Sequence, residues 1–237
     1  MGHRDLADAL AVAARAMQDS RGETDTLEVA VRLAVDVVHG CTSAGLFELD
    51  RNGRVRTTAA TDPLVERGDQ LQLQLGEGPC LTALVGEPVV LSRDLSSESR
   101  WASWSKAASD ELGIRSMLSL QLYTGPRGHG SLNLYSTEQD AFDDRDQAVA
   151  VTLAAQIAAA IAAARRDDQL TASAASRTVI GQAQGILMER YHLDASQAFA
   201  ALIRTSQSSN TKLYAVAETL VRTRQTPAAL TEDDPAR

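Results

Sequence analysis

Two glycines and two glutamines stand close together in the segment Ile180–Arg190. The apolar spacing of this segment predicts a helix, yet Gly181 and Gly185 each weaken a helix by about 1 kcal/mol relative to alanine. The amide side chains of Gln182 and Gln184 carry both hydrogen-bond donors and acceptors. Two interpretations fit these residues. The glycines either let the helix pack tightly on a neighbour, or they leave its backbone open to a ligand beside the glutamines.

A cysteine and two tryptophans are the next residues that could carry chemistry. Cys80 follows Pro79 at a predicted helix start, where the pKa of a thiol can fall, so a redox sensor is one interpretation. A small buried apolar residue is the other. Trp101 and Trp104 lie three residues apart on a predicted helix and either line a ligand pocket or pack in the core. Together the three residues form a candidate sensor pocket.

No pattern typical of catalysis or metal binding occurs in the chain. The phosphate-binding glycine loop, the nucleophile elbow of hydrolases and the His-Glu-x-x-His zinc motif are all missing. Asp143, Asp144 and Asp146 cluster as acidic residues do at the start of a helix. We therefore expect no enzyme and no metal site, and the sequence implies no cofactor. The histidines are scattered: His3, His39, His129 and His192.

The composition is that of an ordinary globular protein, with 44% apolar and 23% charged residues in 237. The longest apolar run, residues 158–164, is far shorter than the roughly 20 residues that span a bilayer. The N-terminal segment lacks the apolar stretch of a signal peptide. Cys41 and Cys80 fit neither a zinc spacing nor a disulfide framework. We expect a cytoplasmic protein with no membrane segment.

The charge is distributed unevenly along the chain. The net charge is −8, yet residues 173–224 hold six basic groups and three acidic ones. A basic segment attached to an acidic body indicates a local polyanionic partner.

The first part of the chain alternates between helical and strand periodicity. A helix is predicted around Leu6–Met17, and a second with Thr26 as its cap and its end at Gly40. Short helices are predicted near Gly78-Pro79 and over Arg100–Leu112. The alternation in the remaining segments predicts an antiparallel sheet with one face in the core. The predicted strands are residues 42–50, 54–60, 89–91, 117–123 and 131–135.

From Phe142 onward the periodicity is helical throughout. Val149, Leu153, Ile157 and Ile161 form a narrow apolar stripe, which predicts pairing with the same helix of a second copy. Residues 165–168 are read as a solvated break in that stripe.

Three further helices are expected to pack as a small bundle. The first is predicted over about 174–191, the second from Asp194 with Gln197 completing a capping box, and the third from near Asn210. The fold class is therefore α+β with an all-α end. The predicted divisions are 1–143 for the α+β domain, 144–172 for the connecting helix, 173–225 for the bundle and 226–237 for a disordered tail.

Several of these segments resemble a known family. Ser176–Arg190, Ala198-Phe199, Thr205–Leu213 and Val216–Glu218 resemble the ANTAR domain, a three-helix RNA-binding module that implies transcription antitermination. The resemblance covers about fifty residues.

The preceding region resembles the GAF domains that come before ANTAR domains in actinobacteria. A GAF domain implies a signal sensor that can hold a small-molecule ligand, although no residue here commits to one. The residues that carry this resemblance are Leu75–Ala83, Asp94-Leu95, Arg100-Trp101, Met117–Leu120 and Ser131–Ser136.

The ANTAR resemblance implies a set of RNA-contacting residues. Family members bind RNA stem-loops, generally as dimers, and unpaired loop bases are what side chains read in RNA. The resemblance places polar contacts on the first and third helices of the bundle, with basic groups near phosphate. The implied residues are Gln182, Gln184, Gly185, Arg190, Ser206, Asn210, Thr211 and Lys212.

One residue departs from the family pattern, which often has lysine at the position of Gln184. Loss of that cation removes about one phosphate contact, or lets Gln184 read a base instead. We expect a signal-responsive regulator of transcription that acts by antitermination as a homodimer. The alternative is a scaffold whose ANTAR-like bundle docks a partner protein and does not bind RNA.

Overall fold

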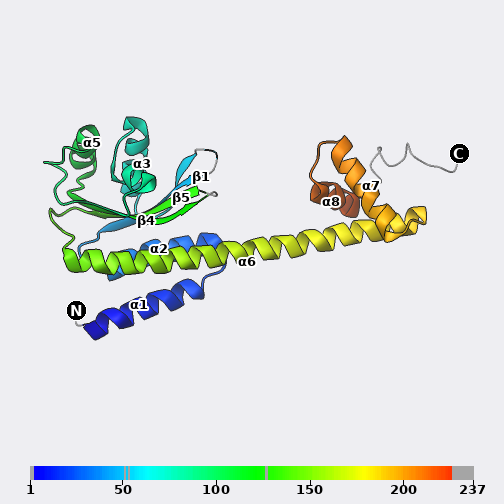
Figure 1. Cartoon of the computed structure of the whole chain (residues 1–237), viewed down its shortest axis with the longest axis horizontal. Helices are drawn as coiled ribbons and strands as arrows, with labels where there is room; N and C mark the ends of the chain where they lie inside the picture. The colour runs from blue at the N-terminus through cyan, green and yellow to red at the C-terminus, as the bar shows by residue number, and fades with distance from the viewer. Residues whose placement is uncertain (1–2, 51, 53, 126–127, 226–237) are drawn as a thin grey trace. The chain divides into compact units, whose positions relative to one another are not determined.

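The computed structural model describes residues 3–50, 52, 54–125 and 128–225 of the chain. The chain divides into two compact units, residues 1–166 and residues 167–237 (Figure 1). The predicted disordered tail, 226–237, lies outside the described residues.

The first unit opens with two helices, α1 (His3–Gln18) and α2 (Gly22–Val37). The prediction that Thr26 caps the second helix is wrong, because α2 begins one turn earlier. Thr26 is buried inside the helix and its hydroxyl donates to the carbonyl of Gly22 at 2.8 Å. A threonine in a helix interior can satisfy its hydroxyl in this way, so its presence did not mark the helix start.

Five strands form one antiparallel sheet within the described residues, in the order β2-β1-β5-β4-β3. This confirms the α+β class. All the strands lie where the alternation of apolar and polar residues predicts them. Their bounds are β1 Ser43–Asp50, β2 Val55–Ala60, β3 Val89–Ser92, β4 Ser116–Gly125 and β5 Gly128–Ser136.

The two faces of the sheet carry different cores. Leu118, Leu120, Leu132 and Leu134 are all buried on the face covered by α2 and the long helix α6, and α1 packs against α2 on the side away from the sheet (Figure 1). The other face lies under three helices that pack around Trp104. These helices are α3 (Pro63–Leu75), α4 (Pro79–Val85) and α5 (Ala102–Leu112).

Helix α3 was not predicted from the sequence. Two of the side chains that it buries, Asp69 and Gln72, are polar, so its apolar periodicity is weak. Its start is nevertheless well defined, because Pro63 follows the capping residue Asp62, whose carboxylate accepts a hydrogen bond from the backbone N–H of Leu64 at 2.8 Å.

Helix α6 (Asp144–Tyr191) is continuous over 48 residues. The separate helix predicted from about 174 is therefore wrong at the level of secondary structure. The apolar stripe does end before residues 166–168, which are exposed, but Arg165 is half-buried and so is not part of a solvated break. No proline or glycine interrupts residues 144–180, and the alanine-rich sequence favours helix. The predicted domain divisions remain predictions.

The apolar stripe on α6 has a different role from the predicted one. Val149, Leu153, Ile157 and Ile161 are at most 5% exposed and belong to the core of the first unit. They pack against the chain's own helices and sheet, so they cannot form the predicted seam with a second copy. Any pairing of two chains along this part of α6 must use its opposite face.

The second unit is a three-helix bundle made by the end of α6 with α7 (Ala195–Ser208) and α8 (Leu213–Thr223). The predicted capping box is confirmed. The carboxylate of Asp194 accepts from the N–H of Gln197 at 2.8 Å, and the Gln197 side chain accepts from the N–H of Asp194 at 2.9 Å. The bundle core consists of Ala183, Leu187, Ala198, Ala201, Leu202, Val216, Ala217 and Leu220.

By length and composition alone, α6 would be long and apolar enough to cross a membrane, the one such helix in the described part of the chain. Core helices of soluble proteins meet the same criteria, and the apolar stripe of α6 lies in the core of the first unit. The expectation that no segment enters a membrane stays a prediction.

Candidate functional site

The two glycines of α6 lie on its exposed face. A Cβ atom built at Gly181 or Gly185 would meet no atom of the described residues within 4 Å beyond its immediate neighbours in the helix. Tight packing on another part of the same chain therefore does not explain these residues. The backbone of this face is open to a partner from outside the chain.

The two glutamines beside them differ in their surroundings. Gln182 is exposed, and its side chain makes no hydrogen bond within the described residues. Gln184 is half-buried and its Nε2 donates to the carbonyl of Ala195 at 3.2 Å. Gln184 thus helps to hold the start of α7 against α6, which leaves Gln182 as the glutamine better placed to meet a ligand.

Arg190 contacts the far end of α8. Its guanidinium Nη2 donates to the carbonyl of Arg224 at 3.0 Å, the residue that ends this helix with a left-handed backbone. A cation at a helix C-terminus is favourable because it meets the last carbonyl groups. Arg190 therefore has a structural partner in the bundle.

The turn between α7 and α8 is built by side chains that were predicted to contact RNA. The Ser206 hydroxyl donates to the carbonyl of Thr211 at 2.6 Å, and the Thr211 hydroxyl donates to the carbonyl of Ser209 at 3.1 Å. Asn210 has a positive φ of 49°, a conformation that asparagine tolerates better than most residues. These residues shape the turn.

The predicted placement of this group on the third helix is wrong. Ser206 lies on α7, Asn210 and Thr211 lie in the turn, and Lys212 occupies the position that precedes α8. The side chain of Lys212 is exposed, and no side chain of the described residues makes a capping hydrogen bond at the start of α8. A cation and unpaired N–H groups at a helix start both favour phosphate.

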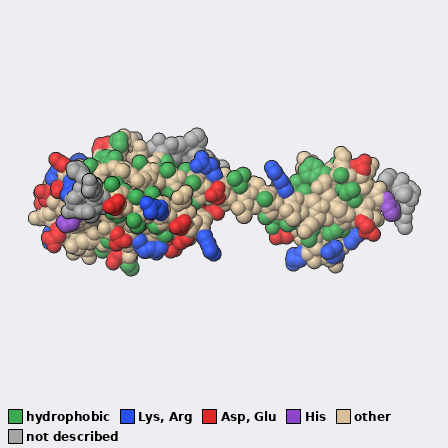
Figure 2. Space-filling view, turned by 90° about the horizontal axis from the view of Figure 1, so that it is seen from below, with side chains coloured by type: hydrophobic (Ala, Val, Ile, Leu, Met, Phe, Trp, Pro, Cys, Tyr) green, Lys and Arg blue, Asp and Glu red, His purple; other side chains and the backbone are tan. Residues whose placement is uncertain are grey.

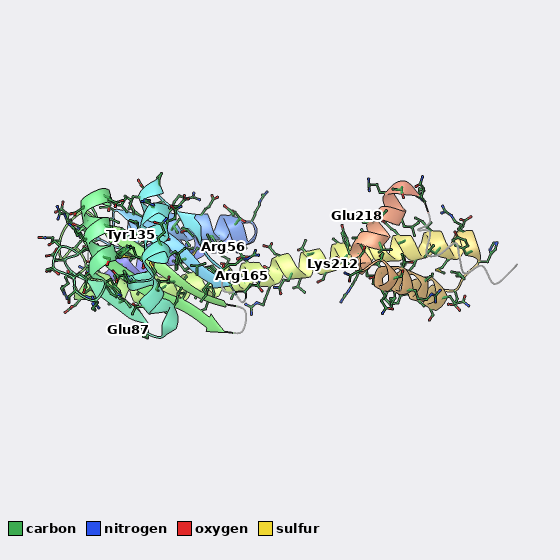
Figure 3. The ribbon with its side chains drawn as sticks, turned by 90° about the horizontal axis from the view of Figure 1, so that it is seen from above. Arg56, Glu87, Tyr135, Arg165, Lys212 and Glu218 are labelled. Atoms are coloured by element: carbon green, nitrogen blue, oxygen red, sulfur yellow. The ribbon has the colours of Figure 1, made fainter. Side chains whose placement is uncertain are left out.

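The basic residues at the two ends of α8 cannot serve one phosphate. Lys212 stands at the start of this 11-residue helix, and Arg190 contacts its end. A helix of this length spans roughly 16 Å. Lys212 lies beside the start of α8 in Figure 3, and Figure 2 shows basic side chains projecting separately from the second unit.

Tyr214 is a candidate that the sequence reading missed. It lies in the first turn of α8, two residues after Lys212, and is 37% exposed. Its hydroxyl donates to the Glu218 carboxylate at 2.9 Å, which holds the ring on the surface of α8. An exposed aromatic ring is a platform for an unstacked base. An aromatic residue two positions after Lys212 was the available signal.

The three residues of the predicted sensor pocket lie in the core of the first unit. Cys80 and Trp104 are fully buried, and Trp101 is nearly so. The indole N–H of Trp104 donates to the carbonyl of Gly68, and that of Trp101 to the Thr82 hydroxyl, both at 3.0 Å. These contacts fit core packing, and the assignment of a ligand pocket to these residues stays a prediction.

Cys80 is held in a polar nest between α3 and the sheet. The side-chain amide of Gln72 contacts its sulfur at 2.6 Å, and the sulfur lies 3.6 Å from Oδ1 of Asp69. Burial and the nearby Asp69 raise the pKa of the Cys80 thiol well above its ordinary value. A buried, protonated thiol is the unreactive kind, so the structure does not favour Cys80 as a redox sensor.

Asp69 is the centre of this nest and was not identified from the sequence. Its carboxylate accepts from the Tyr135 hydroxyl at 2.8 Å and from the Thr57 hydroxyl at 2.7 Å. Burial raises the pKa of Asp69 from 3.8 to about 6, against the effect of these hydrogen bonds. Figure 3 places Tyr135 among the side chains inside the first unit. Nearby buried oxygens without a hydrogen-bond partner in the described residues belong to Ser119, Ser131 and Asn133.

The acidic cluster at the start of α6 confirms the reading as a helix start. Asp143 accepts from the N–H of Asp146 at 2.8 Å, and Asp146 accepts from the N–H of Asp143 at 3.2 Å. No group of three or more possible metal ligands occurs among the described residues. A cavity of about 250 Å³ adjoins this helix start, lined by Val37, His39, Asp143, Arg145, Asp146 and Val149.

Comparison with protein-family models matches two domains to the two units. A GAF domain model matches residues 20–162, which is more than half of the chain. The chain belongs to the GAF domain family. An ANTAR domain model matches residues 168–221, so the GAF domain is followed by an ANTAR domain. The resemblance seen in the sequence is confirmed for both. A comparison with curated proteins finds none that matches this chain.

Solved structures share the fold of the GAF domain at low sequence identity. A GAF domain from a Coxiella burnetii phosphoenolpyruvate-protein phosphotransferase is 20% identical, with a TM-score of 0.58, and the match covers 71% of this chain and 99% of that one. A free methionine-R-sulfoxide reductase from Neisseria meningitidis is 18% identical, with a TM-score of 0.55 and coverage of 68% and 91%. At these identities the likeness shows the fold alone.

Proposed function

We propose that this protein is a signal-responsive regulator that binds RNA stem-loops through its ANTAR domain and acts by transcription antitermination. The GAF domain is the sensor and takes a small-molecule signal. The GAF and ANTAR domains together support a regulator of this kind. Regulation of transcripts places the protein in the cytoplasm, and the two domains are not enzymes in this proposal.

The single observation that carries the RNA-binding proposal is the open face of α6 in the ANTAR domain. Gly181 and Gly185 leave backbone without any side chain above it, and the exposed amide of Gln182 stands beside them. Such a face lets a nucleotide approach the helix closely and offers donors and acceptors for a base edge.

A second group of residues supports phosphate and base contacts at the start of α8. Lys212, the uncovered N–H groups after it, and the ring of Tyr214 lie within three consecutive positions. Phosphate contacts position a protein on RNA, whereas contacts to unpaired bases give the specificity. Asn210 and Thr211 set the turn that presents this group.

Homodimer formation is part of the proposal, with a surface other than the predicted stripe. The face of α6 opposite that stripe is exposed and rich in alanine, and Val151 on it is 45% exposed. Two copies that pair along this face would bring two ANTAR domains to one RNA. The exposed residues of this face are Ala148, Val151, Ala155, Ala159 and Ala162.

A gel shift with two tandem hairpins tests the function. The full-length protein should retain the hairpin RNA and release an RNA of the same length and stems whose loop bases are scrambled. Retention of both RNAs with equal affinity would reduce the interaction to non-specific electrostatics and contradict the proposal.

A scaffold that docks a protein is the alternative, and exposed apolar residues favour it. Met188, Tyr191 and Phe199 are between 36% and 39% exposed on α6 and α7. The variants Lys212→Gln and Asn210→Gly separate the two functions, since glycine tolerates the positive φ of Asn210. RNA affinity that both variants leave unchanged would favour the scaffold.

A further inference from the structure

A cluster of charged and aromatic side chains holds α6 against the sheet at the end of the first unit. Arg165 lies on α6 one residue before the end of this unit. Its Nε donates to the carboxylate of Glu23 on α2 at 2.7 Å, and its Nη2 donates to that of Glu48 on β1 at 2.8 Å. Its guanidinium carbon lies 5.1 Å from the centre of the Tyr123 ring on β4. One side chain thus joins α6 to three other elements.

The contacts of Arg165 are largely shielded from water. The side chain of Glu48 is 9% exposed and that of Arg165 is 25% exposed. Glu48 also accepts from the Tyr123 hydroxyl at 3.0 Å and pairs with Arg56 on β2 at 3.3 Å. Figure 3 shows Arg56 and Arg165 on the same side of the first unit. Shielded pairs are held more strongly than surface pairs, and removal of one partner leaves the other charge uncompensated.

An irregularity in β4 brings Tyr123 into this cluster. Met117 contributes to the core on the α3–α5 side of the sheet, and simple alternation would send Tyr123 to that side too. The register shifts between Gln121 and Tyr123, where two steps on β4 meet one step on β5. Such a bulge redirects the side chains beyond it. Tyr123 accordingly packs with the core on the α6 side.

Gly130 provides the room for this ring. A Cβ atom at position 130 would lie 2.5 Å from Cζ of Tyr123, closer than any side chain allows. The glycine on β5, the bulge on β4 and the aromatic residue therefore serve one arrangement. A second register shift, between Leu46 and Phe47 of β1 opposite β2, precedes the pairing of Glu48 with Arg56. Both irregularities stand beside Glu48.

From this geometry we infer that Arg165, Glu48 and Tyr123 form the point at which the sheet of the GAF domain controls the last turns of α6 in that domain. A shift of β4 or β5 moves the Tyr123 ring and Glu48, and Arg165 passes the change to α6. Arg165 is a positioning residue in this role. The inference goes beyond the proposed function, because it does not depend on the ligand of either domain. When two residues are energetically linked, the effect of substituting both differs from the sum of the two single effects on free energy. A double variant therefore tests the link.

Amide hydrogen exchange in the full-length protein measures this link. The substitution Gly130→Ala displaces the Tyr123 ring from the sheet side, and Arg165→Gln removes the cation from the α6 side. Each should speed exchange at residues 158–168 of α6 by about tenfold or more. The two together should give little more than the larger single effect. Arg165→Lys, which keeps the charge, should restore part of the protection. Arg166→Gln changes an exposed neighbour on the same helix and should have no effect.

Two results would overturn the inference. One is normal exchange of α6 in Gly130→Ala, and the other is a double variant whose effect equals the product of the single effects. Unchanged exchange in α5, which lies on the other face of the same sheet, shows that the variants keep the fold of the first unit. If Arg165→Gln fails to fold, Arg165→Lys combined with Gly130→Ala gives the same comparison. Loss or retention of RNA binding does not enter this test, so its outcome is separate from that of the proposed function.

Discussion

Gly185 is the residue at which stability and binding should move in opposite directions. Leucine at this position meets open space and favours helix, so Gly185→Leu should stabilise the ANTAR domain by roughly 0.5–1 kcal/mol. The same side chain would block close approach to α6 and lower RNA affinity by about tenfold or more, as measured by gel shift.

The matched control for that substitution is Ser173→Leu, at an exposed position on the same helix. It should leave RNA affinity unchanged. Equal affinity of the wild type and of Gly185→Leu for the hairpin would show that this face of α6 does not contact RNA.

Because of Asp69, the GAF domain should lose stability as the pH rises, whereas a carboxylate with a lowered pKa would have the opposite effect. Its pKa is raised from 3.8 to about 6 in the folded protein, so between these values the folded state binds a proton that the unfolded chain does not. Stability from this group is fully present below about pH 4 and is lost as the pH rises to about 6. The shift corresponds to roughly 3 kcal/mol.

Urea unfolding at pH 4 and pH 7 measures this contribution. Between these values the wild type should lose roughly 3 kcal/mol more stability than Asp69→Asn, which keeps an acceptor for Tyr135 but does not titrate. Asp36→Asn, exposed on α2, serves as the control. The same pH dependence in the wild type and in Asp69→Asn would remove Asp69 as its source.

At this scale the sequence predicts residue types better than their roles. Gln184, Arg190 and Ser206 were recognised as polar residues of the right segments, yet each bonds to a backbone carbonyl of the bundle. Such partners lie 5 to 34 residues away along the chain, so only the packing of the helices reveals them. The exposure of Gly181 and Gly185 could not be predicted either. It depends on the fact that no other described residue packs on them, which only the structure reveals.

Among the elements, the start of α7 offers the clearest test of whether a capping residue in the sequence determines where a helix begins. Asp194→Ala removes the acceptor for the first turn and should destabilise the ANTAR domain by about 1 kcal/mol. Faster amide exchange in α7 would report the loss. Ser196→Ala, two residues further on, is the control and should change little. No difference between the two variants would mean that packing alone sets the start of this helix.

Strands were easier to predict than helix ends in this chain. Alternation over Met117–Tyr123 predicts β4. Both faces of this sheet are buried, but the leucines of the strand still recur at every second position and so lie on one face. Helix α3 was not predicted because the side chains that it buries include the polar residues Asp69 and Gln72. The bulge beside Tyr123 could not be predicted from the local sequence. Gly130 is the one residue that points to it, and the role of this glycine becomes clear only when β4 is paired with β5.

At the scale of the whole molecule, α6 is the element that both domains share. It supplies Leu153 and Ile157 to the GAF core and Ala183 and Leu187 to the ANTAR core. The apolar stripe that predicts a dimer from the sequence packs inside its own chain. A stripe that packs within a chain and a stripe that packs against a second copy have the same periodicity. Tertiary packing decided between them.

The exposed face of α6 gives a prediction for the dimer. Val151→Arg places a charge on that face and should shift the protein toward the monomer in sedimentation velocity, because an unpaired charge in an interface is costly. Ser173→Arg, beyond the GAF domain on the same helix, should leave the dimer intact. A dimer that persists in Val151→Arg would exclude this face as the contact.

Binding of RNA stem-loops by the ANTAR domain is tested most directly by sequencing the RNA that is crosslinked to the protein in its host. Under the proposed function, stem-loops that overlap transcription terminators should be enriched, with crosslinks at unpaired loop bases, and that enrichment should be lost in Gly185→Leu. Crosslinked RNA that is no different in Gly185→Leu, or that shows no preference for stem-loops, would contradict it.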